Sequence, residues 1–167
     1  MKVTIFKDVF QKDKPHHINM ATALKRIQQG TSAPTIKLVR DGNKEKKKKL
    51  PVVLFSGEFS TRADEACISH SGYVVLDFDH IDVGSSKKLL GSDPYVYSCW
   101  VSPSGDGLKA LVHITNPERH RDHFRALRTY FHKQYGLEVD ESGINESRAC
   151  FESYDPELSL NEEAASF

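Results

Sequence analysis

The sequence has no long apolar segment and no net charge. No stretch reaches the roughly 18 apolar residues that a membrane helix needs, and the opening "MKVTIFKDVF" has charges inside its short apolar run, unlike a secretory signal. The 23 basic residues balance the 23 acidic ones, so any nucleic-acid-binding surface must be local. We expect a soluble, cytoplasmic protein that does not contact membranes.

Patterns typical of disulfide, zinc and ATPase proteins are also missing. Cys67, Cys99 and Cys150 are far apart and form no C-x-x-C pair, which indicates buried thiols in a reducing compartment. His120 and His123 have no third ligand at a suitable spacing for zinc. No P-loop signature occurs. The candidate chemistry therefore lies in other residues.

Apolar periodicity predicts an α+β fold in one domain, with a small N-terminal α/β unit over residues 1–70 and a second unit over 71–161. In the first unit we expect strands at 2–6, 36–40 and 51–55, and helices at 19–30 and 60–69. The second unit should form strand 73–79, a helix at about 85–91, strands 95–101 and 108–114, helix 117–135 and strand 148–153. This βαββαβ order is the ferredoxin-like or RRM-like pattern.

That topology predicts where distant segments meet. The first and third strands of the second unit would be antiparallel neighbours at the centre of the sheet. The end of the first strand, with Asp77 and Asp79, would then meet the start of the third, near Lys109. The long helix would return the chain to the same edge and bring Asp140 and Arg148 there.

The stretch "YVVLDFDH" ends a predicted strand with two carboxylates. Asp77 and Asp79 share one face because strand side chains alternate, about 6–7 Å apart. Unpaired carboxylates this close repel each other, whereas Mg²⁺ or Mn²⁺ between them would compensate their charge. Capping of the next helix, or pairing with lysines such as Lys87, are the alternatives.

The segment "SPSGDGLKALVHI" is a small-residue turn followed by a strand. Backbone amides of the turn could approach an anion closely, and Lys109 at the start of the strand could bind a phosphate. An ordinary hairpin loop is the alternative. The turn residues in question are Ser102, Ser104, Gly105 and Gly107.

The segment "LEVDESGINESRACFESYDPEL" supplies a third carboxylate and a guanidinium. Asp140 could complete a metal site, and Arg148 suits bidentate contact with phosphate. A surface Asp–Arg pair is the alternative. Upstream, Arg40 and the run Lys46, Lys47, Lys48 and Lys49 could face the phosphates of a nucleic acid, since lysines that neutralise phosphates bind independently of base sequence; the alternative is a solvated loop.

Together these three segments resemble the motifs of the archaeo-eukaryotic primase superfamily, in particular its primase–polymerase (PrimPol) branch. The stretches "KKLPVVLFSGEF", "HSGYVVLDFDH", "SPSGDGLKALV" and "SRACFESYDPEL" are similar to the small VirE-type N-terminal domain placed in that superfamily. The resemblance covers roughly residues 5 to 161. Lys109 stands where many members of the superfamily have a histidine.

The resemblance implies an RRM-like catalytic unit and a metal-dependent nucleotidyltransferase, a DNA primase or polymerase. Asp77, Asp79 and Asp140 would be catalytic and hold two Mg²⁺ or Mn²⁺ ions, while the 102–109 segment and Arg148 would bind the nucleotide. The implied partners are nucleoside triphosphates, a single-stranded or primed DNA template, and a helicase or ATPase domain or protein. The alternatives are a non-catalytic module that binds nucleotide or single-stranded nucleic acid, and a metal-dependent nuclease.

Overall fold

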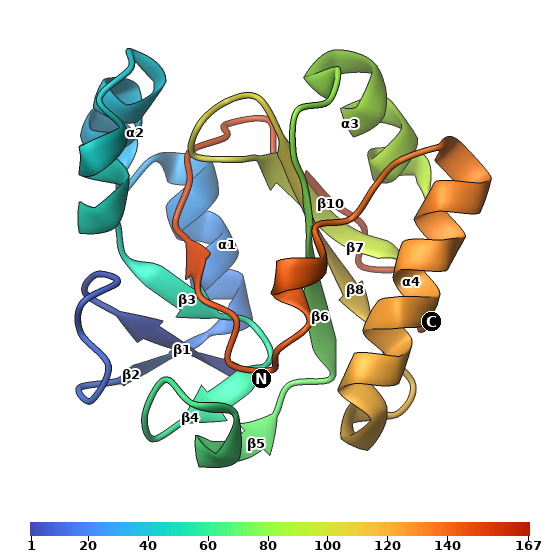
Figure 1. Ribbon diagram of the computed structural model, residues 1–167, viewed down its shortest axis with the longest axis horizontal. Coiled ribbons are helices and arrows are strands. Elements are labelled where there is room, and N and C mark those ends of the chain that lie inside the picture. Colours follow the sequence, from blue (N-terminus) through green and yellow to red (C-terminus); the bar gives the residue numbers. More distant parts are fainter.

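The computed structural model describes residues 1–167 and has a mixed α+β architecture with three antiparallel sheets (Figure 1). The strands are β1 (Lys2–Phe6), β2 (His16–Asn19), β3 (Val52–Leu54), β4 (Gly57–Phe59), β5 (Cys67–His70), β6 (Tyr73–Phe78), β7 (Val96–Val101), β8 (Leu108–His113), β9 (Cys150–Phe151) and β10 (Ser159–Leu160). The helices are α1 (Met20–Gln29), α2 (Ala33–Arg40), α3 (Val83–Ser92) and α4 (His120–Tyr135), with short 3₁₀ helices η1 (Lys44–Lys49), η2 (Asp64–Ala66), η3 (Pro117–Arg119) and η4 (Glu141–Gly143).

The sheet that carries the predicted motifs has the order β10-β7-β8-β6, and both β6 and β7 run antiparallel to β8. Strands β6, β7 and β8 of this sheet are largely buried on both faces. Val74, Leu76 and Phe78 belong to one apolar core with residues of α4, whereas Val75 belongs to a second core with residues of α1. Asp77 has the same parity as Val75, so its side chain lies on the α1 side of the sheet.

Helix α4 forms much as its sequence predicts. Phe124, Leu127 and Phe131 are fully buried at helical spacing. The Asn116 side chain accepts a hydrogen bond at the start of η3, and Gly136 ends the helix in a left-handed conformation. In Figure 1 the helix covers one face of the β6–β8 sheet, while α1 lies on the other side of that sheet. None of the helices combines the length and apolar composition that a membrane crossing requires.

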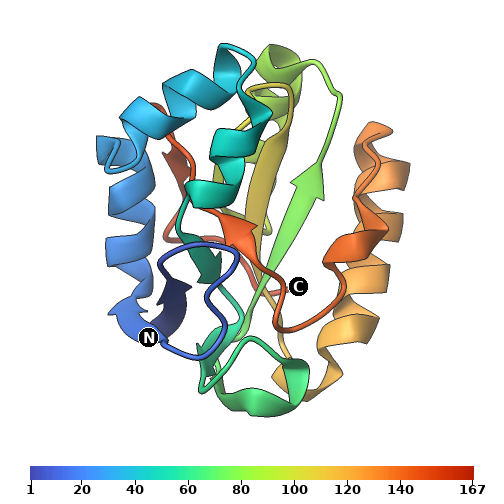
Figure 2. The same cartoon turned by 60° about the vertical axis from the view of Figure 1, so that its left-hand side comes forward.

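The first sheet has the order β2-β1-β3-β9 and lies beside α1 (Figure 2). The predicted strands at 2–6 and 51–55 and the helix between Asn19 and Gly30 are confirmed. Two other predictions in this region are wrong. Residues 36–40 form the end of α2, where Ile36 and Val39 are buried at helical spacing and Leu38 is 45% exposed. Residues 60–69 form η2 and β5, with only a single short turn of helix.

The last predicted strand is shorter than expected and lies in the other sheet. Residues 150–151 form β9, which pairs with β3, so the predicted β-α-β-β-α-β unit does not close on itself. As a consequence β6 is an edge strand and not a central one. The start of η4 lies along this edge, where the Asp140 N–H donates to the Asp77 carbonyl at 2.9 Å.

Candidate active site

A cavity of about 390 Å³ opens where β6 ends beside the turn between β7 and β8. It brings together eight residues that the sequence singled out, from four separate segments of the chain. These are Lys47, Asp77, Asp79, Ser102, Ser104, Lys109, Asp140 and Arg148; Val9, Pro103, Ala149 and Phe151 complete the wall.

Asp77 is the most buried carboxylate of the cavity, at 7% exposure. It is paired in register with Lys109 across β6 and β8, as the topology predicted. The Lys109 ammonium donates to Asp77 Oδ1, and the Arg148 guanidinium donates to Oδ2 at 3.0 Å. Burial raises the pKa of Asp77, but Lys109 and Arg148 outweigh it and hold the pKa below its usual range. Asp77 is therefore ionised and fully paired.

The other two carboxylates lie nearer to solvent. Asp79 follows the last residue of β6 and is exposed at the rim of the cavity. Asp140 is half-buried, and its carboxylate accepts hydrogen bonds from the Ser142 N–H and hydroxyl at 3.0 and 2.7 Å. Those bonds lower the pKa of Asp140, and Arg148 lies 3.6 Å from its Oδ2. Arg148 thus links two of the three predicted carboxylates.

The 102–107 turn is shaped by its glycines. Gly105 has a φ of +83°, a conformation that favours glycine. A Cβ on Gly107 would lie 2.4 Å from the Phe78 carbonyl oxygen, so only glycine permits this approach of the turn to the end of β6. Neither glycine lines the cavity; they position Ser102 and Ser104, which do.

Arg40 and the lysine run lie in different places. The Arg40 guanidinium donates to the carbonyls of Ser102 at 3.1 Å and Tyr154 at 2.9 Å, so it supports the turn from outside the cavity. Among the lysines of η1, only Lys47 lines the cavity, with its ammonium 5.4 Å from the centre of the Phe151 ring. Lys46, Lys48 and Lys49 are exposed beside it and do not line the cavity.

Two polar atoms of the cavity residues have no partner. Five buried side-chain nitrogen or oxygen atoms in the whole protein lack a hydrogen bond, and Ser102 Oγ and Arg148 Nε are two of them. Such atoms are costly unless a ligand or water satisfies them. Both residues line the cavity.

The donor atoms of the cavity fit a hard divalent cation in type, since three carboxylates converge on it. Their present arrangement is not a metal site: no group of three His, Cys, Asp or Glu side chains is placed to hold an ion. Both oxygens of Asp77 are engaged by Lys109 and Arg148. A cation could bind Asp77 only after these two side chains moved to another anion.

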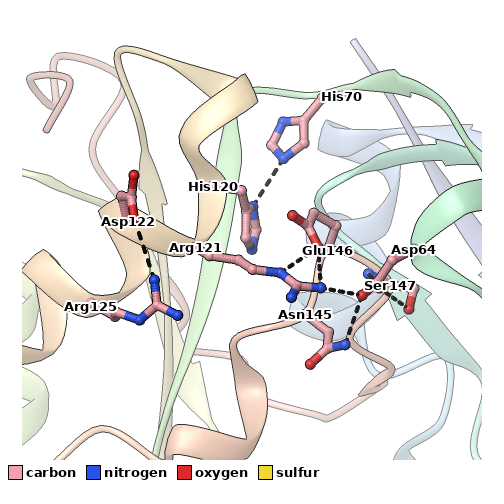
Figure 3. A network of polar contacts seen from close by, with 9 residues as sticks. All are labelled: Asp64, His70, His120, Arg121, Asp122, Arg125, Asn145, Glu146 and Ser147. Carbon is pink, nitrogen blue, oxygen red and sulfur yellow. Dashed lines mark hydrogen bonds and ion pairs between the residues drawn. The ribbon is translucent and has the colours of Figure 1, made fainter.

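The loop that carries Arg148 is anchored, just before Arg148, by a residue that the sequence analysis did not identify. Asp64, in η2, accepts hydrogen bonds from the Ser147 N–H at 2.9 Å and the Asn145 side-chain amide at 2.7 Å, and pairs with Arg121 at 2.8 Å (Figure 3). These partners lie 57 to 83 positions away along the chain, so no local pattern could have indicated them.

A family model described as BT4734-like, N-terminal domain matches residues 45–159, more than half of the chain. The matched segment contains all three carboxylates of the cavity, the 102–107 turn, Lys109 and Arg148. No curated protein and no solved structure shows a significant match.

Proposed function

The chain belongs to the BT4734-like N-terminal domain family, and we propose that it is a metal-dependent nucleotidyltransferase of the primase–polymerase type. It would initiate or extend a nucleic acid strand from nucleoside triphosphates on a DNA template. The observation that carries the proposal is the single cavity that holds Asp77, Asp79 and Asp140 together with Lys109, Arg148 and the serine turn. The likeness of these segments to the three primase–polymerase motifs supports the same reading.

Two cations in this cavity suit a triphosphate. Lys109 is a buried point charge, and burial, which lowers its pKa, is outweighed by Asp77, which keeps it charged. The Arg148 guanidinium can bind phosphate oxygens through several N–H groups, including the unpaired Nε. The Ser102 hydroxyl, which has no partner, could also donate a hydrogen bond to a phosphate oxygen. Together these groups would neutralise the charge of the substrate and orient it.

A triphosphate that paired with Lys109 and Arg148 would also free the Asp77 carboxylate to bind a metal ion. Asp77, Asp79 and Asp140 would then be the residues that hold Mg²⁺ or Mn²⁺. Ions bound there would lower the pKa of the attacking 3′-hydroxyl and stabilise the leaving pyrophosphate. The chain's own part is to hold the carboxylates on one wall and the phosphate-binding cations beside them.

The test is strand synthesis on primed and unprimed templates with labelled nucleoside triphosphates and Mg²⁺ or Mn²⁺. Asp77→Asn and Asp140→Asn should abolish product, and Arg148→Met should slow synthesis about 100-fold, as expected for loss of one electrostatic contact to the reacting group. Asp106→Asn is the matched control, because Asp106 lies in the same turn but outside the cavity wall. Failure to make product on any template, with no stabilisation by triphosphates, would contradict the proposal.

A non-catalytic binding module is the second candidate, and the complete pairing of Asp77 favours it. Such a module would be stabilised by triphosphates yet make no product with either metal. A metal-dependent nuclease would instead shorten a labelled strand in the absence of nucleotides, and the same reactions detect that outcome.

A further inference from the structure

Phe10 is the only aromatic side chain among the large apolar residues that the protein exposes, and it is 64% exposed. Its loop, between β1 and β2, is tied internally. The Asp8 carboxylate accepts the N–H groups of Phe10 at 2.9 Å and Gln11 at 3.1 Å, and the Gln11 side chain accepts the Lys7 N–H at 3.2 Å. These bonds fix the backbone of the loop that carries the exposed Phe10 ring.

Strand pairing places this loop beside η1. In the first sheet Phe6 is opposite Val52, and Val52 is opposite Phe151. The loop that leaves β1 and the 3₁₀ helix that enters β3 therefore lie side by side. Lys49 approaches the Phe10 ring, 5.4 Å from its centre, and Lys47 approaches Phe151 in the same way.

The surface made of Phe10, Lys49, Lys47 and Phe151, which we call the lysine–aromatic surface, leads into the cavity. Lys47 and Phe151 are themselves part of the cavity wall, and so is Val9, the neighbour of Phe10. A ligand that extends from the cavity over this surface would thus contact Lys47 and Lys49 on its way from the cavity to the exposed Phe10 ring.

This region is positively charged, whereas the whole chain has no net charge. Residues 7–14 and 44–49 contain eight lysines and three acidic residues, five positive charges in excess, whereas the chain as a whole has none. Of the five lysines in η1, only Lys48 has a carboxylate partner, Glu45. The remaining ammonium groups are free to neutralise an extended polyanion.

We propose that the lysine–aromatic surface binds single-stranded nucleic acid, with Phe10 stacking on an unpaired base and the lysines of η1 tracking the phosphates. Only a single strand offers both a regular row of phosphates and open base faces, and aromatic stacking between lysines is how such strands are held without sequence preference. That the strand is the template of the cavity rests on the proposed function; binding of the strand does not require catalysis.

The first experiment measures fluorescence anisotropy of a labelled oligothymidine with the intact protein, without metal or nucleotide. Phe10→Ala should weaken binding about tenfold, the usual loss when one stacked base loses its aromatic partner. Phe10→Trp should retain binding. Ile68→Ala is the matched control, because Ile68 is equally exposed at 64% but lies on β5. Equal affinity of Phe10→Ala and the unchanged protein would overturn the proposal.

The second experiment varies salt. A Lys47→Gln/Lys49→Gln double variant should reduce the slope of log affinity against log salt by about 1.4, as two phosphate contacts on a single strand require. Lys133→Gln, an exposed lysine on α4, should leave the slope unchanged. Duplex DNA should bind more weakly than the single strand. If polyglutamate or duplex DNA bound as tightly as the oligonucleotide, the proposal would also be overturned, because the surface would then recognise negative charge alone.

These outcomes separate the two proposals. Strand binding that depends on Phe10, in a protein that makes no product, contradicts only the nucleotidyltransferase function. Synthesis that depends on Asp77, with strand binding unaffected by Phe10 and η1, contradicts only the lysine–aromatic surface.

Discussion

At the scale of single residues, Asp77 is the side chain on which the site depends. A carboxylate with 7% exposure is stable as an anion only when it is compensated, and here two cations compensate it from different elements, β8 and the loop before β9. On the proposed function, a metal ion would compete with these cations for the same two oxygens. The affinity of the free protein for Mn²⁺ should therefore be limited by Lys109 and Arg148.

Replacing Lys109 tests this competition. Lys109→Met should make Mn²⁺ bind at least about tenfold more tightly in the absence of nucleotide, because unit charges 4 Å apart interact by about 4 kcal/mol at an effective dielectric constant of 20. The measurement is calorimetric titration with Mn²⁺. Lys87→Met is the matched control: Lys87 pairs with the buried Asp155 at 2.6 Å, and neither lines the cavity. An unchanged Mn²⁺ affinity in Lys109→Met would make the Asp77–Lys109 pair a structural one.

The sequence predicted the Asp77–Lys109 neighbourhood because the β-α-β-β element order makes its first and third strands antiparallel neighbours. It did not indicate Phe10 or Asp64. Phe10 stands in a short loop with no periodicity to show which way its ring points. Asp64 acquires its role only through partners more than 50 positions away.

At the scale of elements, the predictions are correct where the local sequence determines the element and wrong where tertiary packing determines it. Helix α4 carries its own signals, with Asn116 before it, Gly136 after it and a complete apolar stripe. The segment "APTIKLVR" has no such length, and its β-branched residues Thr35, Ile36 and Val39 favour a strand. It is helical because Ile36 and Val39 find buried positions three residues apart. Tertiary packing decided this element, and propensity did not.

The two left-handed glycines that end α1 and α4 allow a matched comparison of stability. Gly136→Ala should cost about 1 kcal/mol of unfolding free energy, because a Cβ in this conformation is strained but meets nothing within 4 Å. Gly30→Ala should cost about 1–3 kcal/mol more, because its Cβ would lie 2.9 Å from the Tyr154 ring. Urea unfolding at unchanged m-value measures both. Equal losses would mean that the Tyr154 ring moves away freely.

At the scale of the whole molecule, the β6–β8 sheet and the helix α4 that covers it contact the rest of the protein in two different ways, one apolar and one polar. On the α1 side, Val75, Trp100 and Leu111 share a core with α1 and β3, and this apolar contact follows from the composition of the strands. Near β5, the junction with α4 is polar and contains His70 and His120 (Figure 3). Neither this polar contact nor the β3–β9 strand pairing can be predicted from a local sequence pattern, because the partners are far apart along the chain.

The histidine junction predicts how stability depends on pH. His70 Nδ1 accepts the Gly72 N–H at 2.9 Å, so its Nε2 carries the proton and donates to His120 Nδ1 at 3.0 Å. His120 is then neutral, with a buried Nε2–H that has no partner. Burial, and next the adjacent His70, lower the pKa of His120 to about 4; burial also lowers that of His70.

Because the unfolded chain binds protons on His120 below pH 6.5 and the folded protein does not until about pH 4, the unfolding free energy should fall as the pH decreases. We expect a loss of about 2 kcal/mol between pH 7 and pH 5 from His120, measured by urea unfolding at each pH. His120→Gln should flatten this dependence, with the remaining slope from His70. His16→Gln, an exposed residue of β2, should leave it unchanged. If His120→Gln and the unchanged protein lost stability in parallel, the junction between β5 and α4 would not be the acid-sensitive part of this fold.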